Sequence, residues 1–184
     1  GIALDTGNKL VVAGYTLFAG DNDFALARYN ADGSLDTSFG VGGMVTTDFN
    51  DLSDYGYALA RQVDGKLVVA GNVTTIAGTD LALARYDTNG SLDASFDEDG
   101  RVVTNLFGSS DQGQAILMQP DGKLVLVGSV DEGRGTDFGI ARYYSNGTPD
   151  ASFDFDGRLS TDINGFDDYA YAADNATFLI VDIA

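Results

Sequence analysis

The sequence predicts an all-β fold made of tandem four-stranded antiparallel repeats that resemble β-propeller blades. One motif occurs three times, and each copy follows the previous one after 57 residues. Each period also holds four short β-type runs separated by turn signals. A strict period of this length indicates stacked supersecondary units, and four strands per unit are typical of propeller blades. The copies read ALARYNADGSLDTSF (25–39), ALARYDTNGSLDASF (82–96) and GIARYYSNGTPDASF (139–153).

The period sets the expected organisation of the chain. Residues 1–57, 58–114 and 115–171 form three repeats, and residues 172–184 begin a fourth that soon departs from the pattern. This organisation predicts about three and a half blades and about fourteen strands, with two strands in the tail. Propellers close with roughly four to eight blades, so we expect an open array with unpaired edge strands at its ends.

The first two runs of the middle repeat form a predicted hairpin. The run at 55–63 is rich in Tyr, Leu and Ala, and the Asp-Gly-Lys sequence at 64–66 is a tight-turn signal. The next run, 66–71, is almost entirely apolar, as in a strand that is buried on both faces. A glycine closes this run in every repeat, which predicts a bend or a bulge at Gly14, Gly71 and Gly128.

The third and fourth runs complete the repeat. The run at 81–87 is followed by Asn89-Gly90, a dipeptide that favours a tight turn. The run at 101–107 comes directly after Gly100. No window of ten residues has a helical period, so at most a single helical turn is expected, around Leu92–Phe96.

Charge and composition exclude several functions. The chain carries 28 acidic and 10 basic residues, for a formal net charge of −18. Such a surface repels nucleic acid and anionic membranes, and it favours cations or basic partners. The absence of Cys and His excludes thiol catalysis, Ser-His-Asp triads and imidazole-bound zinc. No run of about 20 apolar residues is present for membrane insertion, and the start at Gly1 suggests a processed chain or a piece of a longer one.

The repeated residues also resemble a known family. The order A-R-Y-x-x-[DN]-G-[ST]-x-D-x-S-F, then G-[GRM]-[VL]-x-T, then D-G-K-L-V-[VL]-x-G is similar to the delta-sixty repeat over residues 1–171. This resemblance implies a propeller-like β-repeat in a secreted or cell-surface bacterial protein. It implies no enzyme activity. The last thirteen residues depart from the pattern.

Three positions of the motif are expected to hold each repeat together. An arginine lies eight residues before an aspartate, which predicts a bidentate Arg–Asp pair that fixes the loop after the third strand. A phenylalanine three residues further on is predicted to fill the space between neighbouring blades. The alternative is a ring of charges that binds a ligand. These positions are Arg28, Asp36, Phe39, Arg85, Asp93, Phe96, Arg142, Asp150 and Phe153.

Two further aspartate positions recur just before strands. Aspartates at such places accept hydrogen bonds from turn N–H groups, so both sets are expected to be structural. The set before the third run is Asp23, Asp80 and Asp137, and the set before the first run is Asp54, Asp111 and Asp168.

Two acidic turns are candidates for calcium binding. The sequences at 97–100 (DEDG) and 154–157 (DFDG) place alternating carboxylates before a glycine, and Ca²⁺ binds several oxygen ligands. The EF-hand order is not met, so a plain acidic turn is the alternative. No other cofactor is expected. The predicted ligands are Asp97, Asp99, Asp154 and Asp156.

The sequence favours a non-enzymatic structural or binding scaffold in an extracellular or cell-surface protein of a bacterium. A second hypothesis is a subunit that assembles into fibres or rings through its terminal strands, at 1–5 and 176–184. A third is a glycan-active enzyme that uses two carboxylates as acid and base. The expected partners are further repeats, copies of the same chain, or a surface glycan or protein, and not nucleic acid or membrane.

Overall fold

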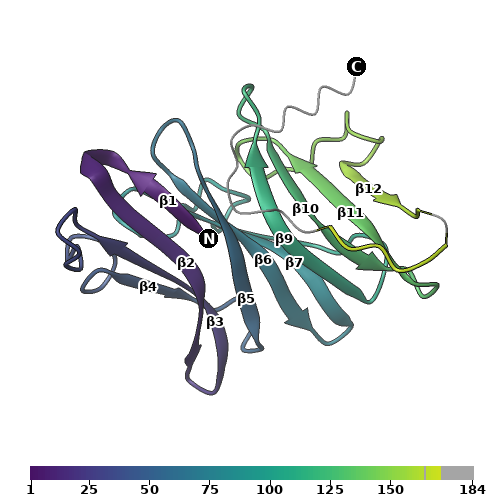
Figure 1. The fold of residues 1–184 in the computed structure, drawn as a ribbon, viewed down its shortest axis with the longest axis horizontal. Helices are drawn as coiled ribbons and strands as arrows, with labels where there is room; N and C mark the ends of the chain where they lie inside the picture. Colours follow the sequence, from purple (N-terminus) through teal and green to yellow (C-terminus); the bar gives the residue numbers. More distant parts are fainter. Residues whose placement is uncertain (164, 171–184) are drawn as a thin grey trace.

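Three four-stranded antiparallel meanders follow one another along the chain in the computed structural model, which describes residues 1–163 and 165–170 (Figure 1). We call them blades 1, 2 and 3. Blade 1 contains β1 (Ile2–Asp5), β2 (Lys9–Phe18), β3 (Asp21–Tyr29) and β4 (Met44–Thr47). Blade 2 contains β5 (Asp54–Arg61), β6 (Leu67–Thr75), β7 (Gly78–Tyr86) and β8 (Arg101–Thr104). Blade 3 contains β9 (Ser110–Met118), β10 (Leu124–Asp131), β11 (Thr136–Tyr143) and β12 (Arg158–Thr161).

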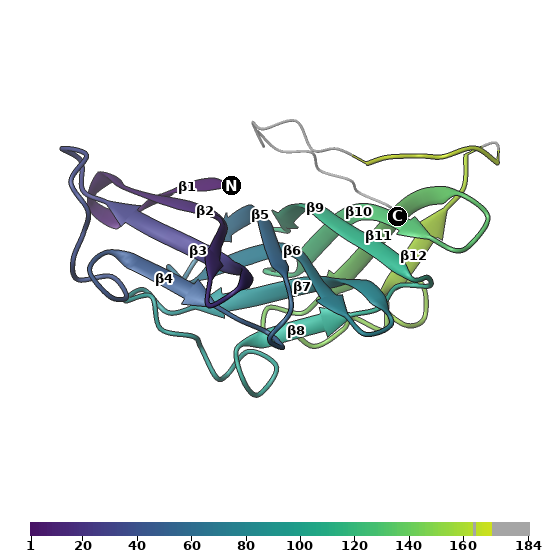
Figure 2. The same cartoon turned by 90° about the horizontal axis from the view of Figure 1, so that it is seen from below.

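The predicted all-β class and open arrangement are confirmed. The blades lie side by side along the long axis of the molecule, and the described part forms no closed ring (Figures 1 and 2). A single parallel bridge between Thr79 and Ser110 joins the sheets of blades 2 and 3. The two strands expected in the tail lie outside the described residues. The blades do not begin at the boundaries of the sequence repeats. Strand β5, the first strand of blade 2, begins at Asp54, which lies inside the first sequence repeat.

Helix is nearly absent, as the sequence predicts. The described residues contain one 3₁₀ turn, η1 (Thr6–Asn8), and none of their helices is long and apolar enough to span a membrane. The single turn expected around Leu92–Phe96 is not helical. Leu92 instead forms an isolated bridge with Tyr86, and the Asp93 N–H donates to the Arg85 carbonyl over 2.9 Å. The backbone of this segment is therefore held by the end of β7.

The predicted hairpin turns form for the expected reason. Between β5 and β6, the Gln62 N–H donates to the Lys66 carbonyl over 2.8 Å, and Gly65 has a φ of 91°. That backbone conformation is unfavourable for residues with a Cβ atom, so the Asp-Gly sequence sets the turn.

The glycine after the apolar run lies inside a strand and does not end it. β6 continues through Gly71 to Thr75, and Gly71 pairs with Gly56 of β5. The register shifts between Gly56 and Ala58, which is a β-bulge, so the bulge is on the partner strand in blade 2. In blade 3 the register shifts directly before Gly128.

Apolar side chains are buried between neighbouring blades, in two separate clusters. Strands β5 and β9, the first strands of their blades, pack against the preceding blade. The cluster between blades 1 and 2 contains Val11, Ala13, Phe24, Leu26, Phe39, Leu67, Val69, Val73, Ala82, Ala84 and Tyr86. The cluster between blades 2 and 3 contains Val68, Ala70, Leu81, Leu83, Phe96, Val102, Leu106, Leu124, Leu126, Val130, Ala141 and Tyr143.

Candidate functional site

Each blade carries the same cluster of basic, acidic and aromatic side chains. In blade 1, Arg28 Nε donates to Asp36 Oδ2 over 2.7 Å, and Lys9 Nζ donates to the same oxygen over 2.6 Å. The Arg28 guanidinium carbon lies 4.5 Å from the centre of the Phe39 ring. Equivalent contacts join Arg85 to Asp93 and Phe96 in blade 2, and Arg142 to Asp150 and Phe153 in blade 3.

The Arg–Asp contact is not the bidentate pair that the sequence predicts. Of the two carboxylate oxygens of Asp36, Arg28 bonds only to Oδ2, because Ser38 donates both its N–H and its hydroxyl group to Oδ1. Hydrogen bonds from Lys9 and Ser38 hold the pKa of Asp36 well below its usual range, so this carboxylate stays ionised.

The same arginine also connects its blade to the next one. Arg28 Nη1 donates to the Thr88 carbonyl over 2.6 Å, and the Gly40 N–H donates to the Asn89 carbonyl over 2.8 Å. We call these two bonds the interblade joint. Between blades 2 and 3 the same joint is formed by Arg85 with the Ser145 carbonyl and by the Asp97 N–H with the Asn146 carbonyl.

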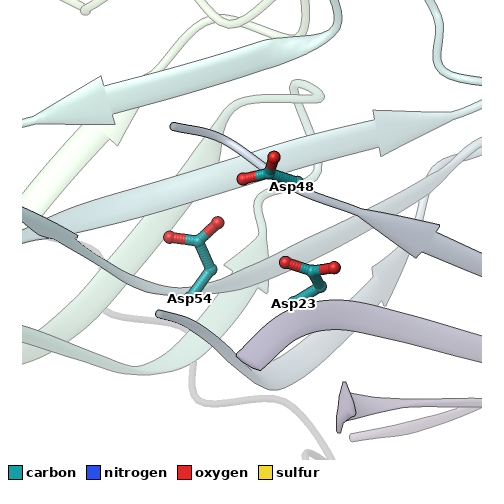
Figure 3. Close-up of side chains that lie close together, drawn as sticks. All are labelled: Asp23, Asp48 and Asp54. Carbon is teal, nitrogen blue, oxygen red and sulfur yellow. The ribbon is translucent and has the colours of Figure 1, made fainter. Parts of the chain in front are cut away.

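Three carboxylates converge where blade 1 meets blade 2, and Figure 3 shows them pointing toward a shared space. Asp23 lies on β3, Asp48 directly follows β4, and Asp54 is the first residue of β5. One oxygen of each residue lies within 4.8 Å of one oxygen of the other two. Asp23 and Asp54 are 2% and 0% exposed, whereas Asp48 is exposed. We call these three residues the first carboxylate cluster.

The loop between β4 and β5 folds around two of these carboxylates. The Phe49 N–H donates to Asp54 Oδ2 over 2.8 Å. The Asn50 and Asp51 N–H groups donate to Asp48 Oδ1 over 2.9 and 2.8 Å. Asp54 and Asp48 therefore each use one oxygen for the turn, which leaves the second oxygen of each for another ligand.

The first carboxylate cluster has no basic counter-charge. No lysine or arginine in the described part of the chain forms an ion pair with any of its three residues. Burial, with repulsion from Asp48 and Asp23, raises the pKa of Asp54 to about 7. Burial, with repulsion from Asp48 among others, also raises the pKa of Asp23. Such a cluster is stabilised by a proton or by a cation.

The 57-residue period repeats the cluster with one informative change. In blade 2, Asp80 and Asp111 occupy the positions of Asp23 and Asp54, but Asn105 stands in place of Asp48. Asn105 Nδ2 donates to Asp80 Oδ1 over 2.8 Å and to the Gly108 carbonyl over 2.9 Å. Blade 2 thus supplies its own donor where blade 1 has a third carboxylate.

Blade 3 restores the third carboxylate, in a more open setting. Asp137, Asp162 and Asp168 converge, with Asp162 exposed and the other two half-buried. Arg134 lines the recess beside them. Asp48 and Asp162 were not singled out from the sequence. The signal that identifies them is the period itself, because they fall at one repeat position with Asn105 between them.

The four carboxylates predicted to bind calcium lie in other turns. Asp97 and Asp154 have left-handed φ values of 47° and 44°. Asp99 Oδ1 accepts a turn N–H, and Asp156 Oδ2 pairs with the Arg158 guanidinium over 2.8 Å. Within residues 1–163 and 165–170, none of the four belongs to a group of three converging carboxylates. Calcium binding by these four residues stays a prediction.

Stability is expected to pass through a maximum as the pH changes, in calcium-free buffer. Hydrogen bonds hold the pKa of Asp36 below its usual range, so its contribution is lost as the pH falls below about 4. Burial raises the pKa of Asp111 from 3.8 to about 6, so folded protein retains a proton that unfolded chain releases. The stability from that proton is lost as the pH rises through about 6.

The measurement is the melting temperature by circular dichroism from acid to neutral pH, with Asp111→Asn as the control. This substitution is expected to make the decline on the neutral side shallower and to leave the acid side unchanged, because Asp54 and Asp23 still contribute to the decline. A melting temperature that rises steadily from pH 4 to pH 8 would contradict the assignment.

The repeated cluster also lies in the segments of the chain that match a protein family. The model of a family described as "Domain of unknown function (DUF5122) beta-propeller" matches residues 8–39, 62–96 and 119–153, which is more than half of the chain. Each match runs through the Lys, Arg, Asp and Phe of the cluster and ends at the phenylalanine, whereas Asp48 and Asp54 fall between two matches. No curated protein matches the sequence. The chain belongs to the DUF5122 β-propeller family.

Proposed function

We propose that the chain is a non-enzymatic structural scaffold, part of an extracellular or cell-surface bacterial protein in which further blades cover its end faces. The family supports a repeat-based scaffold. The delta-sixty resemblance and the acidic surface support the location. One observation carries the proposal: the interblade joint forms twice with equivalent residues, and each end of the array presents one half of it.

Blade 1 leaves uncovered the face that blades 2 and 3 bury against a neighbour. Leu10 and Val12 on β2 are 39% and 41% exposed. The equivalent residues of the other blades are all 0% exposed. The greater exposure in blade 1 therefore comes from the lack of a neighbouring blade on this face and not from the type of side chain. These residues are Leu67 and Val69 in blade 2, and Leu124 and Leu126 in blade 3.

Blade 3 presents the opposite half of the joint. Phe153 is half-buried, whereas Phe96 is fully buried against blade 3. The Arg142 side chain is 19% exposed, compared with 7% for Arg85. Arg85 donates to Ser145 of the next blade, and no described residue accepts the equivalent bond from Arg142.

These complementary faces favour one second candidate, which is head-to-tail assembly of several copies of the chain. In that case the blade 1 face of one copy covers the blade 3 face of another. Both candidates use the same surfaces, and they differ in whether the covering blade belongs to the same polypeptide.

Adding a blade to the chain distinguishes the two candidate functions. A copy of residues 58–114 placed before Gly1 keeps the period and is expected to raise the melting temperature. Val12→Asp should cost within about 0.5 kcal/mol in the present chain and about 3 kcal/mol in the extended chain, where a charge would become buried. Equal costs in the two chains would contradict the scaffold proposal.

The second candidate predicts a different result for the present chain alone. Its mass by light scattering would grow with concentration, and Val12→Asp would stop the growth. Val63→Asp is the matched control, because Val63 is 90% exposed and lies outside this face. A mass that stays at one chain at all concentrations would exclude assembly.

The absence of catalysis is part of the proposal. The recess beside the first carboxylate cluster offers little surface on which a sugar ring could stack. Phe18 is the one aromatic residue among those that line the recess beside the cluster. Release of reducing ends from a polysaccharide would contradict this part.

A further inference from the structure

The first carboxylate cluster contains buried oxygens that have no hydrogen-bond donor. Asp23 Oδ1 and Asp54 Oδ1 are both buried and without a partner among the described residues. The two residues are 2% and 0% exposed, and Figure 3 shows both carboxylates pointing toward the space that Asp48 also faces. An unpaired carboxylate oxygen removed from water is costly, so these oxygens favour a proton or a bound cation as their partner.

We propose that this cluster binds one calcium ion between blades 1 and 2, with Asp23, Asp48 and Asp54 as its protein ligands. Ca²⁺ binds carboxylate oxygens at about 2.3–2.6 Å, so two ligands of one ion lie at most about 5 Å apart. The ligand oxygens here lie within 4.8 Å of one another. Mg²⁺ is usually held by only one or two carboxylates and keeps several of its waters, so three converging carboxylates favour Ca²⁺.

The surroundings favour a cation. Asp21 and Asp51 line the same recess as Asp23 and Asp48. The exposed side of Asp48 gives water access to the remaining coordination positions, and Ca²⁺ accepts waters as well as carboxylates among its six to eight oxygen ligands.

Blade 2 provides the comparison within the chain. Asp111 Oδ1 is unpartnered like Asp54 Oδ1, but the third position holds Asn105, which donates to Asp80. Blade 2 therefore has one carboxylate fewer and an amide donor in place of the cation. The same fold accepts either arrangement, which makes Asp48→Asn a conservative substitution for the test.

The proposal is confined to blade 1. In blade 3, Asp137, Asp162 and Asp168 are half-buried or exposed, and Arg134 adds a positive charge to the recess. Their oxygens do not have the buried, unpartnered character of Asp23 and Asp54.

A calcium ion at this place would connect two blades. Asp23 and Asp48 belong to blade 1, and Asp54 begins the first strand of blade 2. The ion would therefore bind residues of both blades at the β4–β5 connection and would hold the two sheets together at their junction.

The experiment compares four chains, all carrying Asp162→Asn so that blade 3 does not contribute. They are the background chain and the same chain with Asp48→Asn, Asn105→Asp or Val63→Asp, the last a change of charge far from the cluster. Each is melted in chelator and in calcium at constant ionic strength, and calcium binding is measured by titration calorimetry.

The background chain is expected to bind one calcium ion and to melt roughly 5–10 °C higher when calcium is at about a hundred times Kd. Asp48→Asn should abolish both effects while the circular dichroism spectrum stays unchanged. Asn105→Asp should raise the stoichiometry to two, and Val63→Asp should leave it at one. A background chain without a calcium-dependent melt, or an Asp48→Asn chain with the same shift as the background, would overturn the proposal.

Discussion

Replacing Arg85 with alanine is expected to lower the free energy of unfolding by about 3 kcal/mol or more. The side chain is 7% exposed, and its Nη2 lies 2.6 Å from Asp93 Oδ2. It also donates to the Ser145 carbonyl of blade 3, and its guanidinium lies 4.7 Å from the centre of the Phe96 ring. The substitution therefore removes a buried ion pair, one bond of the interblade joint and the packing on an aromatic face at once.

Arg142→Ala is the matched control, because it removes the same residue from the same repeat position. Arg142 keeps the contacts with Asp150 and Phe153, but it is 19% exposed and lacks the bond to a following blade in the described structure. Its loss should cost about half as much or less. Urea unfolding followed by circular dichroism gives both values. Equal costs would show that the interblade bond contributes nothing.

The fold was predictable because its signals are local and repeated. The Asp-Gly and Asn-Gly turns fix the ends of strands within a few residues, and the period carries the assignment from one blade to the next. The pairing of Arg85 with Asp93 was also within reach, since both residues lie in one motif. The second bond of the expected bidentate pair was not, because Ser95 competes for the other carboxylate oxygen.

The first carboxylate cluster depends on contacts that the sequence does not display. Asp23, Asp48 and Asp54 come from β3, from the end of β4 and from the start of the next blade. Each residue alone is an ordinary aspartate near a turn. Only the packing of β5 against blade 1 brings them together. The sequence has Asp, Asn and Asp at positions 48, 105 and 162, so the charge at this repeat position varies. This pattern does not show that the position lies beside the other two aspartates of its cluster.

Replacing Gly71 with alanine is expected to cost about 3 kcal/mol or more, because the added methyl group has no space. A Cβ atom at this position would lie 1.8 Å from the carbonyl oxygen of Tyr55 and 3.0 Å from the Cα of Gly56. Both atoms belong to the bulged backbone of β5, so no side-chain rotation relieves the clash. Strand β5 would have to move away from β6, which would also disturb its packing against blade 1.

Gly14→Ala tests this explanation at the same repeat position. A Cβ atom on Gly14 meets nothing within 4 Å, because β1 begins its pairing with β2 at Val12 and does not extend opposite Gly14. Alanine should therefore be neutral there or stabilise the chain by about 0.5 kcal/mol, since glycine is unfavourable inside a strand. Gly128→Ala should resemble Gly71→Ala, because its Cβ would lie 1.7 Å from the Gln112 carbonyl oxygen. If all three variants unfold at the same urea concentration, the close approach of the first strand is not what requires glycine, and the period alone would explain its recurrence.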